Sequence, residues 1–503
     1  MKRGCAAGGC WRWWVPATVG LTLGGCAAWG PTTPASTSVL PAIDIPAAWR
    51  GADAAGGGAL AVGSESLLAW WQRFDDPLMS EAMGRALVAN TSINGAQSAL
   101  RQAQALRDVA AAGLLPNLGA SASAQRGTAG RNSTGNRFQM GLEGQWVPDV
   151  FGARRGGVDA ADAVAAASAA TLGDTQVQVA SEVALNVIAL RSTQARWSIA
   201  AANLASQQET LQITDWRQQA GLVTVLELEQ ARAAAAQTQS LLPALQTSMQ
   251  QTAHALAVLA GQPPANFLGR QLRLEPVLAS NPAPFAVPAA RADPLPNIPA
   301  YTLRQRADVR ATEHLVAAAL ARVGQAQAQR WPSFAIGGSI ASSAVTLAAL
   351  SHGASVISSL VASVSLPLLD GGAARAQVRA QQAALEQAQQ SYRAAVLGAL
   401  RDVEDALVAL SNDRQRLAHL RIAADAAATA ALLARQRFSS GLVDFQTVLE
   451  TQRNQLSTQD AVVGASADVG RDQVRLFTAL GGGWQPDPSN SNPRGGLVGA
   501  TTR

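Results

Sequence analysis

Cysteine, lysine and aromatic residues are scarce in this chain of 503 residues. The three cysteines, Cys5, Cys10 and Cys26, all lie near the N-terminus, so the remaining chain can form no disulfide of its own. The only lysine is Lys2. Aromatic residues make up 5% of the chain while hydrophobic residues make up 48%, with alanine dominant. This composition favours long, closely packed helices over a bulky globular core.

The sequence also lacks a strong excess of one charge. The formal net charge is +5, but Lys2, Arg3 and Arg12 belong to the first dozen residues, and without them it is +2. No basic stripe remains, so the chain shows no signature of nucleic-acid binding. No stretch offers the roughly 18 continuous apolar residues of a membrane-spanning helix.

Motifs for catalysis and metal binding are missing as well. His254, His314, His352 and His419 are scattered, and Glu313 beside His314 is not followed by further ligands at metal-binding spacing. Neither a phosphate-binding glycine loop nor a nucleophile elbow is present. We therefore expect neither an enzyme nor a metal site, and no cofactor apart from a covalent lipid.

That lipid is predicted from the N-terminus. Residues 1–25 combine a basic start, an apolar run and small residues, as a secretory signal peptide does. The sequence Leu-Gly-Gly-Cys26 resembles a bacterial lipobox, in which Cys26 is lipidated and becomes the first mature residue. An ordinary signal with a chance cysteine is the alternative. Ala27 in place of aspartate favours the outer membrane, by the rule for such lipoproteins.

One motif occurs twice in the remaining chain. Arg217 is followed four residues later by Gly221-Leu-Val, and Arg437 is followed in the same way by Gly441-Leu-Val, 220 residues further on. A glycine inside a helix costs about 1 kcal/mol relative to alanine. We interpret both glycines as bends in long helices of a duplicated fold.

The duplication divides the chain into six segments. These are the signal peptide 1–25, a lipid-anchored linker 26–75, a first repeat 76–265, a proline-rich connector 266–300, a second repeat 301–480 and a tail 481–503. Predicted helices cover about 76–90, 93–115, 157–190, 194–219 and 224–259 in the first repeat, and 303–330, 373–410, 414–439 and 441–480 in the second.

Four segments alternate with the period of two that is typical of β-strands, at about 118–126, 137–147, 334–342 and 356–366. In the second segment, apolar side chains such as Met140 and Trp146 face one way, while Arg137 and Glu143 face the other. Each segment has about the length that a tilted strand needs to cross a bilayer. Two hairpins that cap a soluble core are the alternative.

Four strands cannot close a barrel, and hydrocarbon does not tolerate an open sheet edge. Several chains must therefore share one barrel, and three would supply about twelve strands. A helix of about 34 residues is about 50 Å long, too long to bury itself in a compact domain of this size. The predicted fold is a mixed α and β membrane protein, with the helices forming a stalk or a second barrel.

The chain resembles the outer-membrane factors of tripartite efflux and secretion systems, the TolC and OprM family, in particular lipoproteins of the NodT type. Besides the lipobox, the resemblance rests on Trp-Trp-x-x-Phe-x-Asp-Pro-Leu over 70–78, Leu-Pro at 115–116, Arg-Gln-Arg-Ala-Asp-Val-Arg over 304–310 and Ala-Leu-Gly-Gly-Gly-Trp over 479–484. Position 307 is alanine where the family usually has proline, which leaves that helix start less fixed.

This resemblance implies a homotrimeric conduit with a β-barrel in the outer membrane, a periplasmic α-barrel and an equatorial belt. Its implied partners are outer-membrane lipid, a periplasmic adaptor and an inner-membrane pump of the resistance-nodulation-division type. It places helix-to-helix turns near 191–194 and 411–414 at a periplasmic tip that closes like an iris. Charges there are candidates for the gate: Arg191, Glu404, Asp413 and Arg414. Ordinary surface charge is the alternative for each.

Two other functions stay open on the sequence alone. The chain could be a non-conducting, coiled-coil lipoprotein of the outer membrane, or the duct of a type I secretion system. The adaptor itself is disfavoured, because adaptors have one helical hairpin flanked by β-rich domains.

Overall fold

The computed structural model describes residues 69–129, 133–264, 287–290, 305–351 and 356–484, together with positions 40, 41, 43 and 49. The signal peptide, Cys26 and most of both linkers lie outside the described residues.

The long helices come in two pairs of equal length. Helices α4 (Ala153–Gln219) and α10 (Ala373–Ser439) each have 67 residues, and α5 (Val225–Leu259) and α11 (Phe445–Ala479) each have 35. Every boundary in the second pair lies 220 residues after its counterpart in the first. The duplicated helical plan is therefore repeated residue for residue.

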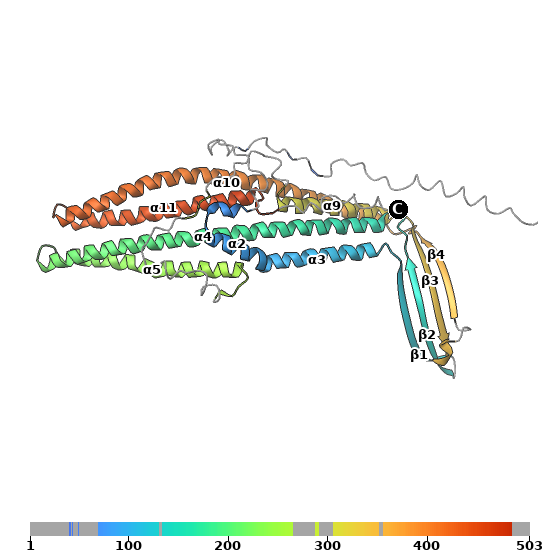
Figure 1. Ribbon diagram of the computed structural model, residues 1–503. Helices are drawn as coiled ribbons and strands as arrows, with labels where there is room; N and C mark the ends of the chain where they lie inside the picture. Colours follow the sequence, from blue (N-terminus) through green and yellow to red (C-terminus); the bar gives the residue numbers. More distant parts are fainter. Residues whose placement is uncertain are drawn as a thin grey trace, which may run out of the picture. The chain divides into compact units, whose positions relative to one another are not determined.

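Two helix breaks predicted from the sequence are wrong. Turns were expected at 191–194 and 411–414, but α4 and α10 run unbroken through both segments. The chain reverses instead at 220–224 and 440–444, where α4 meets α5 and α10 meets α11 (Figure 1). The expected breaks contain polar residues but neither glycine nor proline, so nothing in them prevents a helix from continuing.

Shorter helices precede each strand pair. A 3-10 turn, η3 (Trp70–Phe74), leads into α2 (Pro77–Ala89) and α3 (Thr91–Ala112), and α9 (Ala307–Ala328) opens the second half. Asp76 caps α2: its Oδ1 accepts hydrogen bonds from the backbone N–H groups of Leu78 at 2.8 Å and Met79 at 3.2 Å.

All four predicted strands are present and form one antiparallel sheet in the order β1-β2-β3-β4. Their bounds are Asn117–Ala129, Ser133–Trp146, Ser333–Ala344 and Val356–Ser365. A short 3-10 turn, η4 (Ala348–Ser351), lies between the last two. Strands β1 and β2 are longer than expected, because they extend into the segment between the predicted strands 118–126 and 137–147. The pairing of β2 with β3 joins the two repeats.

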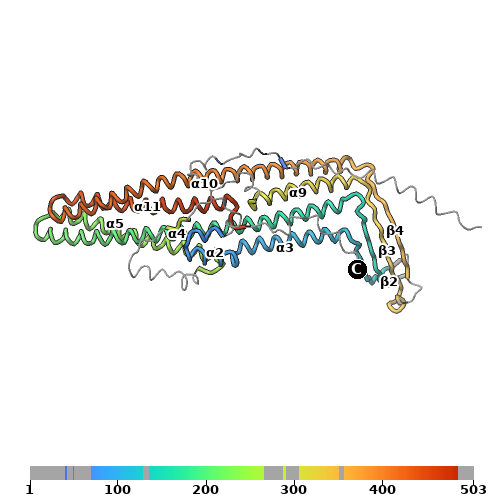
Figure 2. The backbone as a smooth tube through the Cα atoms, turned by 45° about the horizontal axis from the view of Figure 1, so that its top comes forward, coloured from blue at the N-terminus to red at the C-terminus, as the bar shows by residue number. Residues whose placement is uncertain are grey.

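The chain forms two compact units, and each draws residues from both repeats. The first unit, 1–40, 107–161 and 318–386, holds the sheet and the adjoining helix ends. The second, 41–106, 162–317 and 387–503, holds the two long helical hairpins. Within the second unit, α4 lies beside α5 and α10 beside α11 in both views (Figures 1 and 2).

The main apolar core of the helical unit gathers η3, α2, α4, α5 and α11. Trp70 is buried and stacks on Phe477, with ring centroids 5.3 Å apart. Met79 and Met83 of α2 pack into the same core with Ile188 of α4. The Trp-Trp-x-x-Phe motif thus anchors the segment that precedes the first repeat.

Among the described helices, α10 contains an 18-residue window with a mean hydropathy of 1.3, of which 28% is buried inside the structure. By length and composition alone this window could cross a membrane. It lies within a helix of 67 residues, far longer than the roughly 20 that a bilayer requires, so the window alone does not identify a span.

Candidate functional site

The register of the sheet separates two faces, because cross-strand partners point the same way. One face is mainly apolar: Leu118, Phe138, Met140, Leu142, Trp146, Phe334, Ile336, Ile340, Leu360 and Val364. The other is mainly polar, with Ala335, Ala341, Ile357 and Val361 as its apolar side chains: Asn117, Ser121, Ser123, Gln125, Arg137, Gln139, Glu143, Gln145, Ser339, Ser343, Ser359 and Ser363. The alternation predicted for the four segments therefore lines up across the sheet into two faces.

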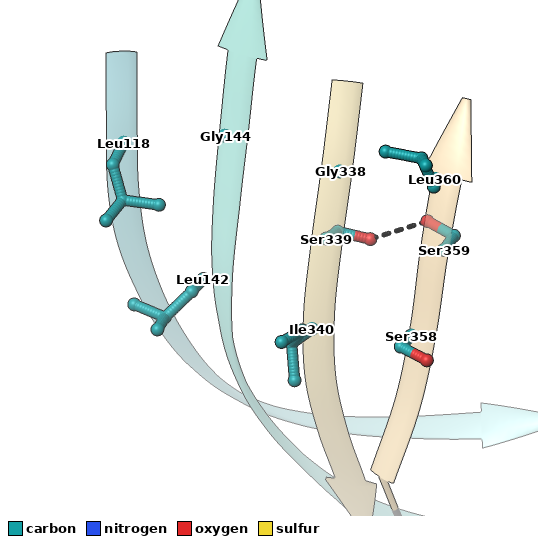
Figure 3. Close-up of a pocket in the computed structure, with 9 residues that line it drawn as sticks. All are labelled: Leu118, Leu142, Gly144, Gly338, Ser339, Ile340, Ser358, Ser359 and Leu360. Atoms are coloured by element: carbon teal, nitrogen blue, oxygen red, sulfur yellow. Dashed lines mark hydrogen bonds between the residues drawn. The ribbon is translucent and has the colours of Figure 1, made fainter. Parts of the chain in front are cut away.

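The apolar face is exposed. Leu118 and Leu360 are 75% and 82% exposed, and Leu142 and Ile340 are exposed between them. Figure 3 shows these four side chains around Gly144 and Gly338, which are direct cross-strand partners and leave a shallow hollow of about 470 Å³. An exposed apolar surface of this kind marks contact with a membrane or with another protein.

On β3 and β4 the polar face is built from small side chains, whereas β2 contributes longer ones such as Arg137 and Glu143. The hydroxyls of Ser339 and Ser359 are hydrogen-bonded at 2.8 Å across β3 and β4 (Figure 3). Glu143 is the cross-strand partner of Ser339 on the other side. Small hydroxyl groups with few charges suit the wall of a water-filled passage.

Aromatic residues gather where the strands meet the helices of the first unit. The ring of Phe151 stacks on Trp331 at 5.6 Å and on Phe334 at 6.4 Å. The indole N–H of Trp146 donates to the carbonyl of Leu114 at 3.0 Å. Aromatic side chains with one apolar and one polar end are typical of the boundary between membrane and water.

The turns of the helical hairpins are built alike. Gly221 has a φ of +70° and Gly441 a φ of +74°, a left-handed conformation that glycine adopts without strain. The N–H of Leu222 donates to Arg217 O at 2.8 Å, and the N–H of Leu442 donates to Arg437 O at 2.9 Å. These bonds close a Schellman motif. Both glycines therefore end a helix, and the prediction that they bend a continuous helix is wrong.

The next helix starts at once after each turn. Thr224 caps α5 in a capping box with Glu227. Asp444 caps α11, and hydrogen bonds from the hydroxyl and the N–H of Thr447 hold the pKa of its carboxyl below the ordinary value.

The two turns are fastened to each other within the helical unit. The Arg217 guanidinium donates to Ser439 O at 2.8 Å and lies over the ring of Phe438, 4.6 Å from its centroid. Phe438 also makes an edge contact with Phe445, at 5.8 Å. At the surface of the turns, Leu222 and Leu442 are each 74% exposed. The hairpins therefore end in a joined tip with an apolar surface.

The four predicted gate residues do not lie at this tip. Arg191 is inside α4, where its Nε donates to Asp76 Oδ2 at 2.8 Å and its Nη2 to Oδ1 at 3.2 Å. It ties α4 to the start of α2. Glu404, Asp413 and Arg414 are inside α10, and Asp413 forms an ion pair with Arg416 at 3.6 Å. Their predicted position at a helix-to-helix turn is wrong.

The Arg-Gln-Arg-Ala-Asp motif over 304–308 joins the start of α9 to the end of α11. Arg306 donates two hydrogen bonds to Asp308, at 3.0 and 2.8 Å, and one to the carbonyl of Ala479 at 3.0 Å. In the first repeat the side-chain amide of Asn90 donates to the carbonyl of Leu259 at 2.9 Å, 220 residues before Ala479. Each repeat thus ties the C-terminus of its returning helix with a different side chain.

Known proteins share this architecture. The family model described as outer membrane efflux protein matches residues 82–262 and 298–482. Nodulation protein T of Rhizobium leguminosarum bv. viciae is 30% identical over 433 residues, which cover 86% of this chain and 87% of that protein. OpmQ of Pseudomonas aeruginosa, a pyoverdine export outer membrane protein, is 30% identical over 434 residues, covering 83% and 88%.

Solved structures agree. The outer-membrane channel OprN superposes with a TM-score of 0.76 at 31% identity, covering 89% of this chain and 99% of that chain. VceC of Vibrio cholerae gives a TM-score of 0.73 at 26% identity, covering 83% and 99%. The chain therefore belongs to the outer membrane efflux protein family.

Proposed function

We propose that three copies of this chain share one barrel of about twelve strands in the outer membrane. The observation that carries this proposal is the sheet itself, which has an exposed apolar face, a polar face and only four strands. In this sheet β1 and β4 pair on one side only. Edges inside a membrane must be paired, so the sheet needs neighbouring copies to complete it.

The protein is the outer-membrane channel of a tripartite efflux system, and it works with a periplasmic adaptor and an inner-membrane pump. The polar face of the sheet would line the passage, and the long helices would form the periplasmic part of the protein. The conduit would be passive, with energy supplied by the pump. Lipid attached to Cys26 would anchor each chain to the outer membrane.

We further infer that the joined tip of the helical hairpins meets the adaptor. Support comes from the exposed Leu222 and Leu442, which leave an apolar surface at the turns. Arg191, Glu404, Asp413 and Arg414 stay candidates for charges that influence conduction, because a helical residue away from the turns can still face a lumen.

A matched pair of arginine substitutions tests the barrel. Leu360→Arg places a charge on the apolar face of β4, where it costs about 2–4 kcal/mol at the bilayer midplane. Ser359→Arg places the same charge on the polar face, one residue away. We expect L360R to reduce membrane-inserted trimer, and S359R to keep the trimer but change single-channel conductance in planar bilayers.

The opposite pattern, with S359R blocking insertion and L360R tolerated, would reverse the assignment of faces. A monomeric wild-type protein with no conductance would instead favour the structural coiled-coil lipoprotein.

A further inference from the structure

One carboxyl group in the helical unit is buried, and only one of its two oxygens accepts a hydrogen bond in the described contacts. Asp472 of α11 is 1% exposed. Its Oδ1 accepts a hydrogen bond from Arg475 at 3.1 Å, one helical turn further along. No donor among the described residues reaches its Oδ2. An ionised carboxylate oxygen buried without a donor is costly, so this atom needs an explanation.

The neighbour of Asp472 on the facing helix is another acid. The carboxyl of Asp413, on α10, lies within hydrogen-bonding reach of it. Two ionised carboxylates are acceptors only and repel each other, whereas a carboxylic acid can donate to a carboxylate. A single proton between the two groups would therefore satisfy Oδ2 and remove the repulsion.

The surrounding charges leave this pair short of donors. Arg416 of α10 contacts Asp413 at 3.6 Å but also donates to Asp468 of α11 at 3.2 Å, and Asp468 pairs in addition with Arg471. In the described contacts, Arg475 donates a hydrogen bond to only one oxygen of Asp472. Arginines alternate with the acids along the two helices, and their positive charges disfavour binding of a metal cation between Asp413 and Asp472. A proton is therefore the natural occupant of this pair.

We propose that Asp413 and Asp472 form a proton-binding site that fastens α10 to α11. With the proton bound, the carboxylic acid of Asp472 donates a hydrogen bond to Asp413, and this bond joins α11 to α10. When the proton leaves to solvent, two negative charges face each other across the same contact, and the helix pair is weakened without being unfolded.

The electrostatics set the pH range. Burial raises the pKa of Asp472 from 3.8 to about 6, and the hydrogen bond and charge of Asp413 add to the rise, while Arg475 opposes it. Between pH 4 and pH 6 the folded protein holds a proton that the unfolded chain has released. Stability therefore falls as the pH rises through this interval and stays lower above it.

The test is thermal unfolding of the full-length protein in detergent at pH 5.0 and pH 7.5. We expect the midpoint temperature of the wild type to fall by several degrees between the two values. Asp472→Asn keeps the shape and supplies an amide donor toward Asp413. This variant should unfold at the wild-type temperature or above it at pH 7.5, and should lose most of the pH dependence.

Two further variants separate this site from an ordinary ion pair. Glu229→Gln removes an exposed acid that pairs with Arg232 at the same spacing on α5, and should leave the pH dependence unchanged. Arg475→Gln removes the charge that opposes proton binding, and should move the midpoint of the pH profile upward. If D472N instead unfolds several degrees below the wild type at both pH values, with the pH dependence intact, Asp472 is an ionised partner of Arg475 and the proposal is overturned.

Discussion

Single residues in this chain often fasten two elements at once, and Asp76 is the clearest case. Its carboxylate caps α2 through two backbone N–H groups and also accepts two hydrogen bonds from Arg191 of α4. The side chain of Asp76 is 7% exposed, so these partners, rather than water, stabilise its negative charge. The sequence carries a local signal for this cap, the Asp-Pro dipeptide. It could not show Arg191, which lies 115 residues away.

Arg191→Gln should therefore destabilise the helical unit. Removing one member of a buried ion pair costs about 3 kcal/mol, since the remaining charge is left without its partner. Arg85→Gln is the matched control, because Arg85 pairs with the more exposed Glu81 and should lose less than about 1 kcal/mol. Thermal melting followed by circular dichroism compares the two variants. Equal losses of stability would show that the buried pair contributes no more than the exposed one.

At the scale of elements, local signals predicted the strands well but misplaced the helix turns. Strands were found because alternation of apolar and polar residues has a period that helices do not share. The turns were missed because each glycine was interpreted by itself. Gly221-Leu-Val is followed by the cap Thr224 and then by Glu227, a complete stop and start signal. Its second copy has the same Gly-Leu-Val and ends in the cap Asp444, but it has Thr447 in place of the glutamate of the capping box.

The corrected position of the glycines changes what substitution should do. Gly221→Ala and Gly441→Ala force a left-handed conformation on a residue with a Cβ, at about 1–2 kcal/mol each, although no atom lies close enough to clash. Gly398→Ala is the control: it lies inside α10 with open space around its Cα and should stabilise by up to about 1 kcal/mol. Opposite signs in melting temperature are expected, and stabilisation by all three would contradict the Schellman turns.

At the scale of the whole molecule, the sequence alone led to the proposal of a shared barrel, through the mismatch between four strands and a closed sheet. The sequence could not show which ends of the long helices meet a partner, since that depends on where the helices stop. With the turns at 220–224 and 440–444, exposed leucines replace the charged residues Arg191, Glu404, Asp413 and Arg414 as the surface of the tip.

This reassignment predicts the behaviour of a double variant, Leu222→Asp with Leu442→Asp. The trimer and its conductance should be unchanged, because both side chains are exposed at the turns and pack little against their own chain. Copurification of the adaptor and dye efflux from cells that carry the cognate pump should both fall at least tenfold, since two apolar contacts per chain are lost at a surface repeated three times in the trimer.

Leu241→Asp provides the comparison, because Leu241 is an exposed leucine of α5 that lies away from the turn. It should leave adaptor binding intact if the tip is the docking surface. Loss of binding in L241D together with normal binding in the double variant would move the docking surface from the tip to the flank of the hairpin. Normal efflux in every variant would mean that the adaptor holds the helices by contacts other than these leucines.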